Sequence, residues 1–540
     1  MHIWPCFLGY LRYIRPNSIS NNSKNISVEI IIFDFIMNKR STETRQQLIS
    51  EHDTLSFLIW AQYSKLFNRL LKLEHAYCGA LYYTDLSGHE ITEDMVAQLE
   101  KSIRNILTTD TPIEIVQKKK SEMIEYFAKK GMADKVGVLK TIVSNTIDCI
   151  QCGNHIDYIL EPHSVDKTRL QIFSLKKYLN GFVVTFPSLT NLTEASEWKE
   201  PKLLQQMISS YSDFIRSTGI DTVSKLNEII FKNKFEKLKV ISEYLHDKQI
   251  ADIARRLCDN FEHKRVITIA GPSSSNKTTF AKRLELALAA CGHKTLVIEM
   301  DDYFVDEKDS PLDEDGNMDW ESVDCINILV LAERVNALVR GETVKRRKFD
   351  WVRCISVDSD EEMTLKPGHF LIMEGIHGLN PKLLNALGQD NVTPIYVQPT
   401  TPINIDHNHR FPCSDYRMIR RFIRDHNFRN FPSRSTIDIW SRVRYGEMVN
   451  IFPYQENAEY FFNSALIYEL PVLTMQGRLL LAEASVPTDK EDAQSPSTIA
   501  LNNEIIRLNN LMNLFYPIPL DVVHKTSCIR EFLGGSDLKY

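Results

Sequence analysis

The stretch Val266-Ile-Thr-Ile-Ala-Gly271-Pro-Ser-Ser-Ser-Asn-Lys277-Thr-Thr279 decides the fold of this 540-residue chain. It joins an apolar β-type run to a Ser-rich loop, and a helical pattern with Phe280 and Leu284 follows it. Strand, loop and helix in this order are the context that a Walker A phosphate loop requires. Successive backbone N–H groups and the N-terminus of the following helix can then cradle phosphates.

One position departs from the GxxxxGK[ST] pattern, because Asn276 stands where the second glycine belongs. Asn is among the non-glycine residues most often found with positive φ, so we expect the loop to keep its shape, with the amide crowding the phosphates. We expect Lys277 to reach the β- and γ-phosphates of ATP and the Thr278 hydroxyl to help hold Mg²⁺. The alternative is a Ser-rich turn that binds no nucleotide. The predicted ATP-binding residues of the loop are Gly271, Pro272, Ser273, Ser274, Ser275, Asn276, Lys277, Thr278 and Thr279.

The alternation of strand, loop and helix continues after the phosphate loop. It predicts an α/β fold with a mostly parallel sheet covered by helices on both faces. The predicted strands are Val266–Ala270, Thr295–Met300, Phe370–Met373, Pro394–Gln398 and Ala465–Leu473.

Two carboxylates follow strands of this predicted sheet. Ligands of open α/β sheets bind outside the carboxyl ends of the strands. Asp301 follows the second strand, where it could accept a proton from a substrate hydroxyl. Glu374 follows the third strand, where we expect it to contact Mg²⁺. A helix cap or an ordinary surface acid is the alternative for Asp301, and many strands end in an acid.

Residues 410–444 contain nine Arg and no Lys. Arg417, Arg420, Arg421 and Arg424 have helical spacing, so several of them share one face. The planar guanidinium suits phosphate oxygens better than an ammonium does. We therefore predict a lid that closes over the γ-phosphate. A solvated basic face and an RNA-binding patch are the alternatives.

The composition is that of an ordinary globular protein. Hydrophobic residues make up 43% and charged residues 25%, which excludes a largely disordered chain. The net charge of −6 does not indicate a nucleic-acid binder overall. No apolar run approaches the roughly 20 residues of a membrane span, so we expect no membrane partner. The ten cysteines are sparse and irregularly spaced, which indicates reduced thiols, so we expect a cytoplasmic protein. Cys149, Cys152 and His155 invite a zinc interpretation, but no second pair exists and we favour buried thiols.

Longer stretches resemble the uridine kinase and phosphoribulokinase superfamily of P-loop kinases. The closer match is a nucleoside-kinase-like subgroup that carries an N-terminal region related to threonyl-tRNA synthetase. The stretches that carry the resemblance are GPSSSNKTTFAKRL, EMDDYFVDEKDSPLDEDGNMDWESVD, LIMEGIHGLNPKL, RMIRRFIRDHNFR, YGEMVNIFPYQENAEYFFNSALIYELPVL and IREFLGGS.

This resemblance implies transfer of the γ-phosphoryl group of ATP, with Mg²⁺, to the 5′-hydroxyl of a nucleoside such as uridine or cytidine. It implies Asp301 as the catalytic acid/base, Phe304 as an aromatic beside the nucleoside and Asp319 as the acid that holds ribose hydroxyls. The remaining implied roles are catalytic for Lys277, Arg417 and Arg421, ATP-binding for Arg420 and Arg424, and metal-binding for Thr278 and Glu374. Two further hypotheses stay open: a kinase of another small hydroxyl metabolite, such as a sugar phosphate or pantothenate, and a nucleotide-binding or RNA-associated regulator.

Residues 52–187 are similar to the second additional domain of threonyl-tRNA synthetases, through LSFLIWAQYSKLF, GALYYTDLSGHEITEDMVAQLEKSI and CGNHIDYILEPHSVD. Such domains edit mischarged tRNA with an H-x-x-x-H pair, a Cys and a further His. Here His52 lacks its partner because Ser56 stands there, Ile159 takes the Cys position, and His163 remains. We therefore expect a scaffold, a dimerisation surface or an RNA contact, and a homo-oligomer is compatible with this.

The chain thus divides into five expected parts: a poorly defined extension at 1–50, a synthetase-like α+β domain at 51–201, a helical connector at 202–262, a P-loop kinase domain at 263–483, and a linker with a C-terminal tail at 484–540.

Overall fold

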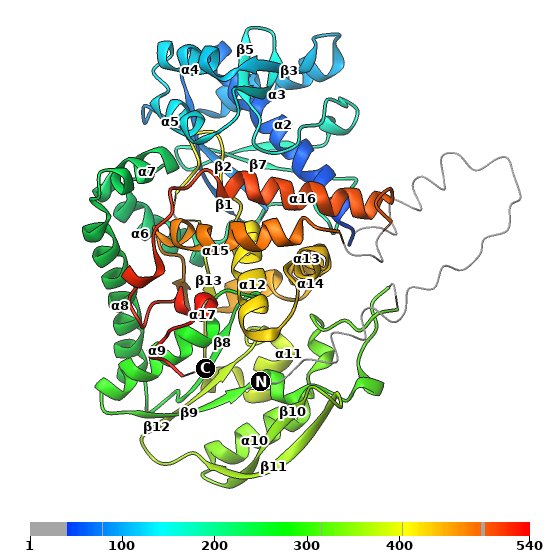
Figure 1. The fold of residues 1–540 in the computed structure, drawn as a ribbon. Helices are drawn as coiled ribbons and strands as arrows, with labels where there is room; N and C mark the ends of the chain where they lie inside the picture. The colour runs from blue at the N-terminus through cyan, green and yellow to red at the C-terminus, as the bar shows by residue number, and fades with distance from the viewer. Residues whose placement is uncertain (1–39, 78, 315, 402, 488–491, 540) are drawn as a thin grey trace, which may run out of the picture.

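The computed structural model describes residues 40–77, 79–314, 316–401, 403–487 and 492–539. Most of the extension expected at residues 1–50 lies outside these ranges. Figure 1 shows an N-terminal α+β domain at one end, a column of helices along one side and a parallel-sheet domain at the other end. Helices from the C-terminal third of the chain lie between the two domains.

The N-terminal domain has two antiparallel sheets with helices packed on them, the α+β organisation that the sequence predicts. The sheet orders are β1-β2-β7-β6 and β3-β4-β5. Helix α3 begins after Thr92, whose hydroxyl accepts a hydrogen bond from the Met95 N–H, so this N-cap is as expected. The elements are α2 (Thr42–Phe67), β1 (Leu71–Tyr77), β2 (Ala80–Asp85), α3 (Glu93–Thr108), β3 (Ile113–Lys119), α4 (Lys120–Lys129), α5 (Ala133–Thr141), β4 (Thr146–Cys152), β5 (His155–Tyr158), β6 (Ser174–Tyr178) and β7 (Gly181–Thr185).

The predicted connector is helical. It consists of α6 (Lys202–Thr218), α7 (Val223–Phe231) and α8 (Phe235–Asp259). Helix α8 runs beside the sheet domain and packs its buried side chains Ile250 and Leu257 into the same cluster as the first helix of that domain. The connector therefore also covers part of one face of the sheet.

The second domain is built on a five-stranded sheet in the order β14-β13-β8-β12-β9, in which every neighbouring pair is parallel. The strands are β8 (Val266–Ala270), β9 (Lys294–Glu299), β12 (His369–Glu374), β13 (Val392–Gln398) and β14 (Tyr460–Asn463). Strand β8 lies at the centre and is buried along its whole length. This is the parallel sheet of a P-loop kinase fold, as predicted.

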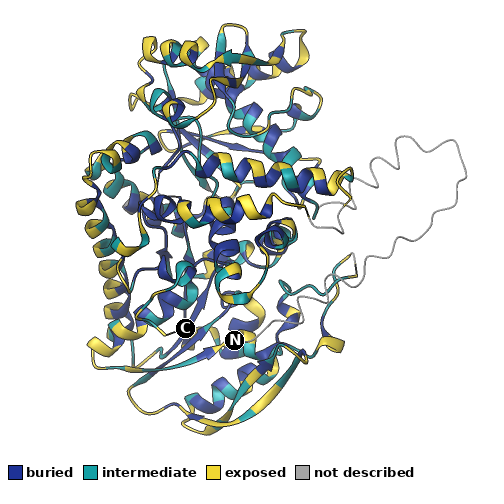
Figure 2. Ribbon diagram, viewed as in Figure 1, coloured by how far each residue is buried: buried dark blue, intermediate teal, exposed yellow. Residues whose placement is uncertain are grey.

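Helices cover both faces of this sheet, because successive residues of a strand point to opposite sides. Ile267 and Ile372 face α8 and α9 (Lys277–Ala290), whereas Leu371 and Met373 face α10 (Ile328–Val339) and α11 (Pro381–Leu387). Figure 2 shows the sheet as a buried layer between partly exposed helices. A hairpin of β10 (Thr343–Asp350) and β11 (Ile355–Thr364) extends this domain beyond α10.

One predicted strand is wrong. The run Ala465–Leu473 ends in the first turn of helix α15 (Glu469–Ala484), and the edge strand β14 precedes it. A short, fully buried apolar run does not distinguish a strand from a helix by periodicity. Pro471 decides the matter, since proline is tolerated in the first turn of a helix but cannot donate a hydrogen bond within a sheet.

Five further α-helices belong to the described part of the chain: α12 (Cys413–Arg429), α13 (Ser433–Asp438), α14 (Trp440–Asn450), α16 (Pro496–Met512) and the short α17 (Arg530–Leu533). The segment expected as linker and tail therefore contains a 17-residue helix, α16. Helix α16 packs against α15, α13 and α2, so the C-terminal part of the chain joins the two domains.

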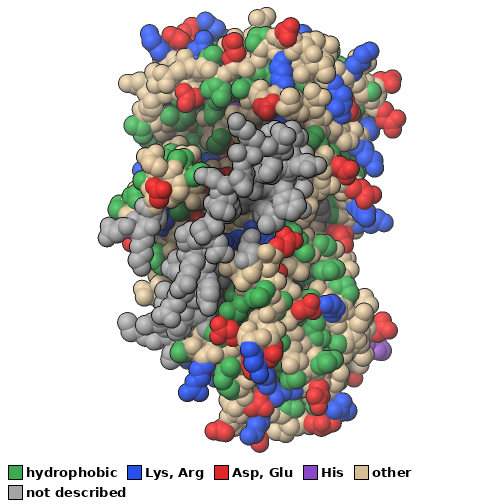
Figure 3. Space-filling model, turned by 90° about the vertical axis from the view of Figure 1, so that its right-hand side faces the viewer, with side chains coloured by type: hydrophobic (Ala, Val, Ile, Leu, Met, Phe, Trp, Pro, Cys, Tyr) green, Lys and Arg blue, Asp and Glu red, His purple; other side chains and the backbone are tan. Residues whose placement is uncertain are grey.

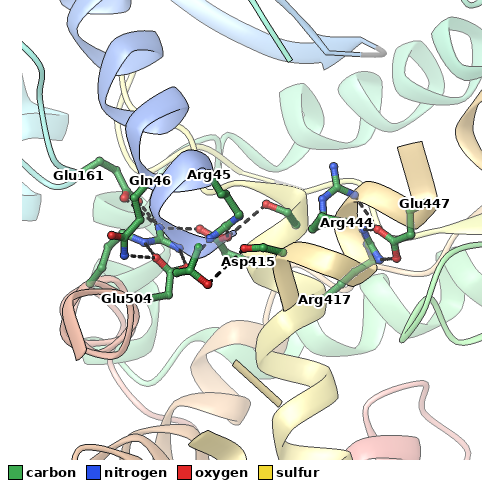
Figure 4. Close-up of polar contacts among 12 residues, drawn as sticks. Arg45, Gln46, Glu161, Asp415, Arg417, Arg444, Glu447 and Glu504 are labelled. Carbon is green, nitrogen blue, oxygen red and sulfur yellow. Dashed lines mark hydrogen bonds and ion pairs between the residues drawn. The ribbon is translucent and has the colours of Figure 1, made fainter. Parts of the chain in front are cut away.

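A buried ionic network links the domains at this junction (Figure 4). Asp415 at the start of α12 accepts hydrogen bonds from Arg45 Nη2 of α2 at 2.6 Å and from Arg507 Nη1 of α16 at 2.7 Å. Arg507 also binds Glu504 and Glu161. Arg45, Asp415, Glu504 and Arg507 are each at most 7% exposed. The N-terminal domain therefore holds the first turn of α12.

On the face drawn in Figure 3, Lys and Arg side chains are interspersed with Asp and Glu side chains over the described surface. An RNA contact by the N-terminal domain stays a prediction. Along the described ranges, no helix combines the length and the apolarity that crossing a bilayer demands. Cys149 and Cys152 are free buried thiols on β4, as predicted, and the described residues contain no cluster of three metal-ligating side chains.

Candidate functional site

The phosphate loop connects the end of β8 to the start of α9. Gly271 is required there, since a Cβ at this position would lie 2.0 Å from the carbonyl oxygen of Val397. Ser274 and Asn276 have positive φ values of 57° and 71°. Asn276 thus adopts the left-handed conformation that its type tolerates, and the loop keeps the shape that the sequence predicts.

The Asn276 side chain is held by the C-terminal segment, and the expectation that it crowds the phosphates stays a prediction. Its Nδ2 atom donates hydrogen bonds to the carbonyl oxygen of Cys528 at 2.9 Å and to Glu531 Oε2 at 3.0 Å. The amide is therefore drawn toward the C-terminal segment. No sequence pattern near the loop signals this contact, because the partners lie about 250 residues away along the chain.

Three arginines of helix α12 donate hydrogen bonds to the phosphate loop. Arg417 Nη1 donates to the Ser273 carbonyl at 3.0 Å, and Arg420 Nη1 donates to the Ser274 carbonyl at 3.2 Å. Arg421 Nη1 donates to the Ser273 hydroxyl at 3.0 Å. These contacts fix two carbonyl groups of the loop, and the Ser273 N–H donates to Glu447 Oε1 at 3.2 Å.

The predicted arginine lid is a core helix in this structure. Arg420 is completely buried and its guanidinium binds both oxygens of Glu469, at 2.6 and 2.8 Å. Arg417 binds Glu447 in the same way, and Arg424 pairs with Asp425. A helical arginine face was predictable, but two of the buried acids that bind it, Glu447 and Glu469, come from other helices. A direct phosphate contact by any of the four arginines stays a prediction.

The carboxyl edge of the sheet brings the predicted charged residues together. Glu374 lies at the end of β12, in register with Glu299 of β9 and Ile269 of β8. The Thr278 hydroxyl donates to Glu374 Oε2 at 3.0 Å, and Lys277 Nζ donates to the Pro272 carbonyl at 3.3 Å. Thr278 of the loop therefore lies beside Glu374 and Glu299, at the carboxyl ends of two neighbouring strands.

Burial and like charges raise the pKa values of the carboxyl groups at this edge. Desolvation raises the pKa of Glu374 to about 7; nearby Lys277 lowers it, and the carboxylates of Asp301 and Glu299 raise it. The pKa of Asp301 is also raised, mainly by desolvation, although its side chain remains accessible to solvent. Glu374 is therefore poised to bind a cation or to exchange a proton near neutral pH.

The loop fits a nucleotide triphosphate and Mg²⁺. The Ser274 hydroxyl is buried and has no hydrogen-bond partner within the described structure, so it can donate to a phosphate oxygen. The N–H groups of the loop precede the N-terminus of a 14-residue helix, which favours anions. Thr278 and Glu374 supply the oxygen ligands that Mg²⁺ prefers.

The two residues predicted to bind the acceptor differ in access. Phe304 is buried and its ring contacts Trp320, Phe349 and Trp351 at centroid distances of 5.6 to 5.7 Å. Asp319 instead lines a small cavity of about 50 Å³, together with Trp320 and Arg421. This volume is below the roughly 300–1,000 Å³ of typical ligand pockets, so a ligand of that size does not fit the cavity in this structure.

Glu321 is a site residue that the sequence interpretation missed. It lines the same cavity, and its Oε2 atom is buried without a hydrogen-bond partner among the described residues. Desolvation raises its pKa to about 7, and the Glu447 carboxylate adds to this. Gly446 makes room for it, since a Cβ there would lie 2.4 Å from the Glu321 Cβ. Its place two residues after Asp319 was the available signal.

His52 and His163 of the N-terminal domain are bound to backbone carbonyl groups, unlike the charged residues at the edge of the parallel sheet. His52 Nε2 donates to the Pro187 carbonyl at 3.1 Å, and its ring stacks on Phe186 at 4.4 Å. His163 Nδ1 donates to the Glu161 carbonyl at 2.8 Å. Desolvation lowers the pKa of both imidazoles to about 4. Both rings are therefore neutral at pH 7 and held by backbone groups.

Comparison with known proteins shows similarity in the region of the parallel-sheet domain. The family model described as Phosphoribulokinase / Uridine kinase family matches residues 266–465. A uridine kinase of Halobacterium salinarum is 24% identical over 159 residues, which are 29% of this chain and 61% of that protein. A uridine kinase of Anoxybacillus flavithermus is 27% identical over 178 residues, 33% of this chain and 75% of that protein.

Two further proteins have weaker similarities to this chain. A threonine--tRNA ligase of Thermoplasma acidophilum is 22% identical over 155 residues, which are 28% of this chain and 23% of the ligase. A solved D-glycerate 3-kinase from Cryptococcus neoformans aligns with 39% of this chain and 89% of its own, at 14% identity and a TM-score of 0.26. The chain therefore spans less than two thirds of the first of these uridine kinases and under a quarter of the ligase.

Proposed function

We propose that this protein is an ATP- and Mg²⁺-dependent kinase that phosphorylates the 5′-hydroxyl of a nucleoside of the uridine or cytidine type. The observation that carries the proposal is the meeting of Lys277, Thr278, Asp301 and Glu374 at the carboxyl edge of the parallel sheet. The match of residues 266–465 to the kinase family model supports the reaction class. The uridine kinases among the relatives support the acceptor.

The chain's own residues have distinct parts in this reaction. The loop N–H groups and Lys277 bind and neutralise the phosphates, while Thr278 and Glu374 hold Mg²⁺. Bound Mg·ATP supplies the transferred phosphoryl group and further charge neutralisation. Asp301 accepts the proton of the acceptor hydroxyl, and its raised pKa brings its proton affinity closer to neutral pH.

Positioning supplies most of the acceleration in phosphoryl transfer, so the rigidity of the loop matters. Arg417 and Arg420 fix the loop carbonyls, and Asp415 ties the same helix to Arg45. We therefore propose that the N-terminal domain serves as a scaffold for α12. The two neutral, backbone-bound histidines do not favour editing chemistry there.

The test is a product assay with Mg·ATP and a panel of acceptors: uridine, cytidine, adenosine, a sugar phosphate and pantothenate. The Asp301→Asn variant is the control, since it keeps the size of the side chain and removes the base. We expect a nucleoside 5′-monophosphate from uridine or cytidine, and its loss in the variant. Product from pantothenate or a sugar phosphate alone would replace the nucleoside by another acceptor. Nucleotide binding with no turnover of any acceptor would contradict the kinase.

A further inference from the structure

The C-terminal segment Ser527–Leu533 lies directly against the phosphate loop, although about 250 residues separate them in sequence. Cys528, Ile529 and Phe532 of this segment are completely buried. In Figure 1 the short helix α17 lies beside α12, close to the start of α9. The segment is therefore part of the wall of the candidate nucleotide site.

A single oxygen of this segment takes three donors of the loop. Glu531 Oε2 accepts hydrogen bonds from the Thr279 N–H at 3.3 Å, from the Thr279 hydroxyl and from Asn276 Nδ2 at 3.0 Å. Thr279 lies in the first turn of α9, whose free N–H groups and positive dipole end attract anions. In a Walker A loop these are the groups that bind phosphate oxygens. The Glu531 carboxylate thus brings a negative charge to one N–H group of this kind, that of Thr279, and to two side-chain donors beside it.

The rest of the segment is anchored to elements that themselves hold the loop. The Phe532 ring lies 4.9 Å from the Arg420 guanidinium, and the Phe532 carbonyl accepts a hydrogen bond from Asn427 Nδ2 at 2.9 Å. Arg283 of α9 donates to the Cys528 sulfur at 3.5 Å. The contact between Glu531 and the loop is therefore one of several that fix this segment.

The residue at the glycine position of the motif makes a second link. Asn276 Nδ2 binds both the Cys528 carbonyl and Glu531, which a glycine could not do. The same residue that departs from the Walker A pattern is thus the one that joins the loop to the C-terminal segment.

We propose that Ser527–Leu533 is an internal competitor of ATP, in which Glu531 occupies donors of the phosphate site and Asn276 latches it there. This inference rests on the proposed function, since it concerns regulation of the same nucleotide site. A tethered group has an effective concentration on the order of millimolar, so even a weak contact competes with ATP at comparable concentrations. ATP binding then requires that the carboxylate leave Thr279.

The test measures the Kd of Mg·ATP by calorimetry for the full-length protein and for Glu531→Gln, Glu531→Ala and Asn276→Gly. Asp521→Asn, an exposed acid on the preceding stretch, is the matched control. Removing a charge-assisted hydrogen bond from the competing state should tighten ATP binding by about tenfold for Glu531→Ala and about threefold for Asn276→Gly. The control should bind ATP as the unchanged protein does.

A second readout follows the segment itself. Amide hydrogen exchange at residues 527–533 should increase when Mg·ATP is added to the unchanged protein, since the segment must release the loop. Equal or weaker ATP binding by folded Glu531 variants, or unchanged protection of the segment in the ATP complex, would overturn the competitor while leaving the kinase intact. If no variant binds ATP at all, both the competitor and the proposed function fail.

Discussion

At the carboxyl edge of the parallel sheet, Asp301 is open to solvent and Glu374 has a pKa of about 7, whereas His52 and His163 of the N-terminal domain are neutral and bound to backbone carbonyls. Both regions carry residue types that perform catalysis elsewhere. Only the sheet edge combines access, opposing charges and partner groups from several elements. Residue type alone therefore does not identify a site, because the surroundings decide whether a group can act.

The largest effect on activity is expected from replacing Lys277, the lysine at the carboxyl edge of the sheet. Lys277→Ala should lower kcat by about 10²–10³, because one preorganised charge at the phosphates is lost. Lys294→Ala, an exposed lysine at the start of β9, is the control and should change kcat less than twofold. Turnover assays with saturating Mg·ATP measure both. Equal rates for Lys277→Ala and the unchanged protein would remove the phosphate loop from the mechanism.

The scaffold role of the N-terminal domain predicts a large effect on stability. Arg45→Ala leaves the buried Asp415 without one of its two cations and should lower the free energy of unfolding by about 3–5 kcal/mol. Arg216→Ala, which breaks an exposed pair on α6, should cost no more than about 1 kcal/mol. Chemical denaturation of the two variants compares them. A similar small loss in both would show that the domain junction does not support α12.

Replacing Glu374 by Gln should raise the stability of the fold while weakening the Mg²⁺ site. Its folded pKa of about 7 exceeds the unfolded value, so the folded state binds more protons between about pH 4.5 and 7 and loses stability as the pH rises through this range. Glu374→Gln should therefore raise the free energy of unfolding at pH 8 by about 1–3 kcal/mol and weaken Mg²⁺ dependence. Denaturation at pH 5 and pH 8 checks this. A loss of stability at pH 8 would contradict the assignment.

The smallest expected effect concerns the histidines. His52→Gln and His163→Gln should each change kcat less than twofold, because both rings serve local packing and hydrogen bonding. The same acceptor assay measures this, with thermal unfolding as the check on folding. A tenfold loss of turnover in a folded variant would connect the N-terminal domain to the chemistry and end the contrast between the two regions.

The sheet and the loop were predictable because their signals are local. A buried parallel strand reads as a continuous apolar run, and β8 is followed at once by the phosphate loop. Asp301 and Glu374 could be placed since the carboxyl ends of parallel strands share one edge. The strand expected at Ala465–Leu473 failed where an apolar run had no periodicity to separate it from a helix.

The partners of the loop could not be predicted in this way. Glu447 and Glu469 bind the arginines of α12 from other segments, and Glu531 reaches the loop from near the C-terminus. Such contacts depend on how distant elements pack, which composition and spacing do not contain. The helical spacing of the arginines predicted that they lie on one helix, but it did not predict the buried acids that bind Arg417 and Arg420.

A crystal structure with Mg²⁺ and a non-hydrolysable ATP analogue tests the proposed nucleotide site most directly. We predict phosphates against the N–H groups of residues 274–279, Lys277 Nζ at the terminal phosphates, Mg²⁺ beside Thr278 and Glu374, and the Asp301 carboxylate facing the γ-phosphate. A nucleotide bound elsewhere, with Lys277 and Glu374 unchanged, would contradict the account.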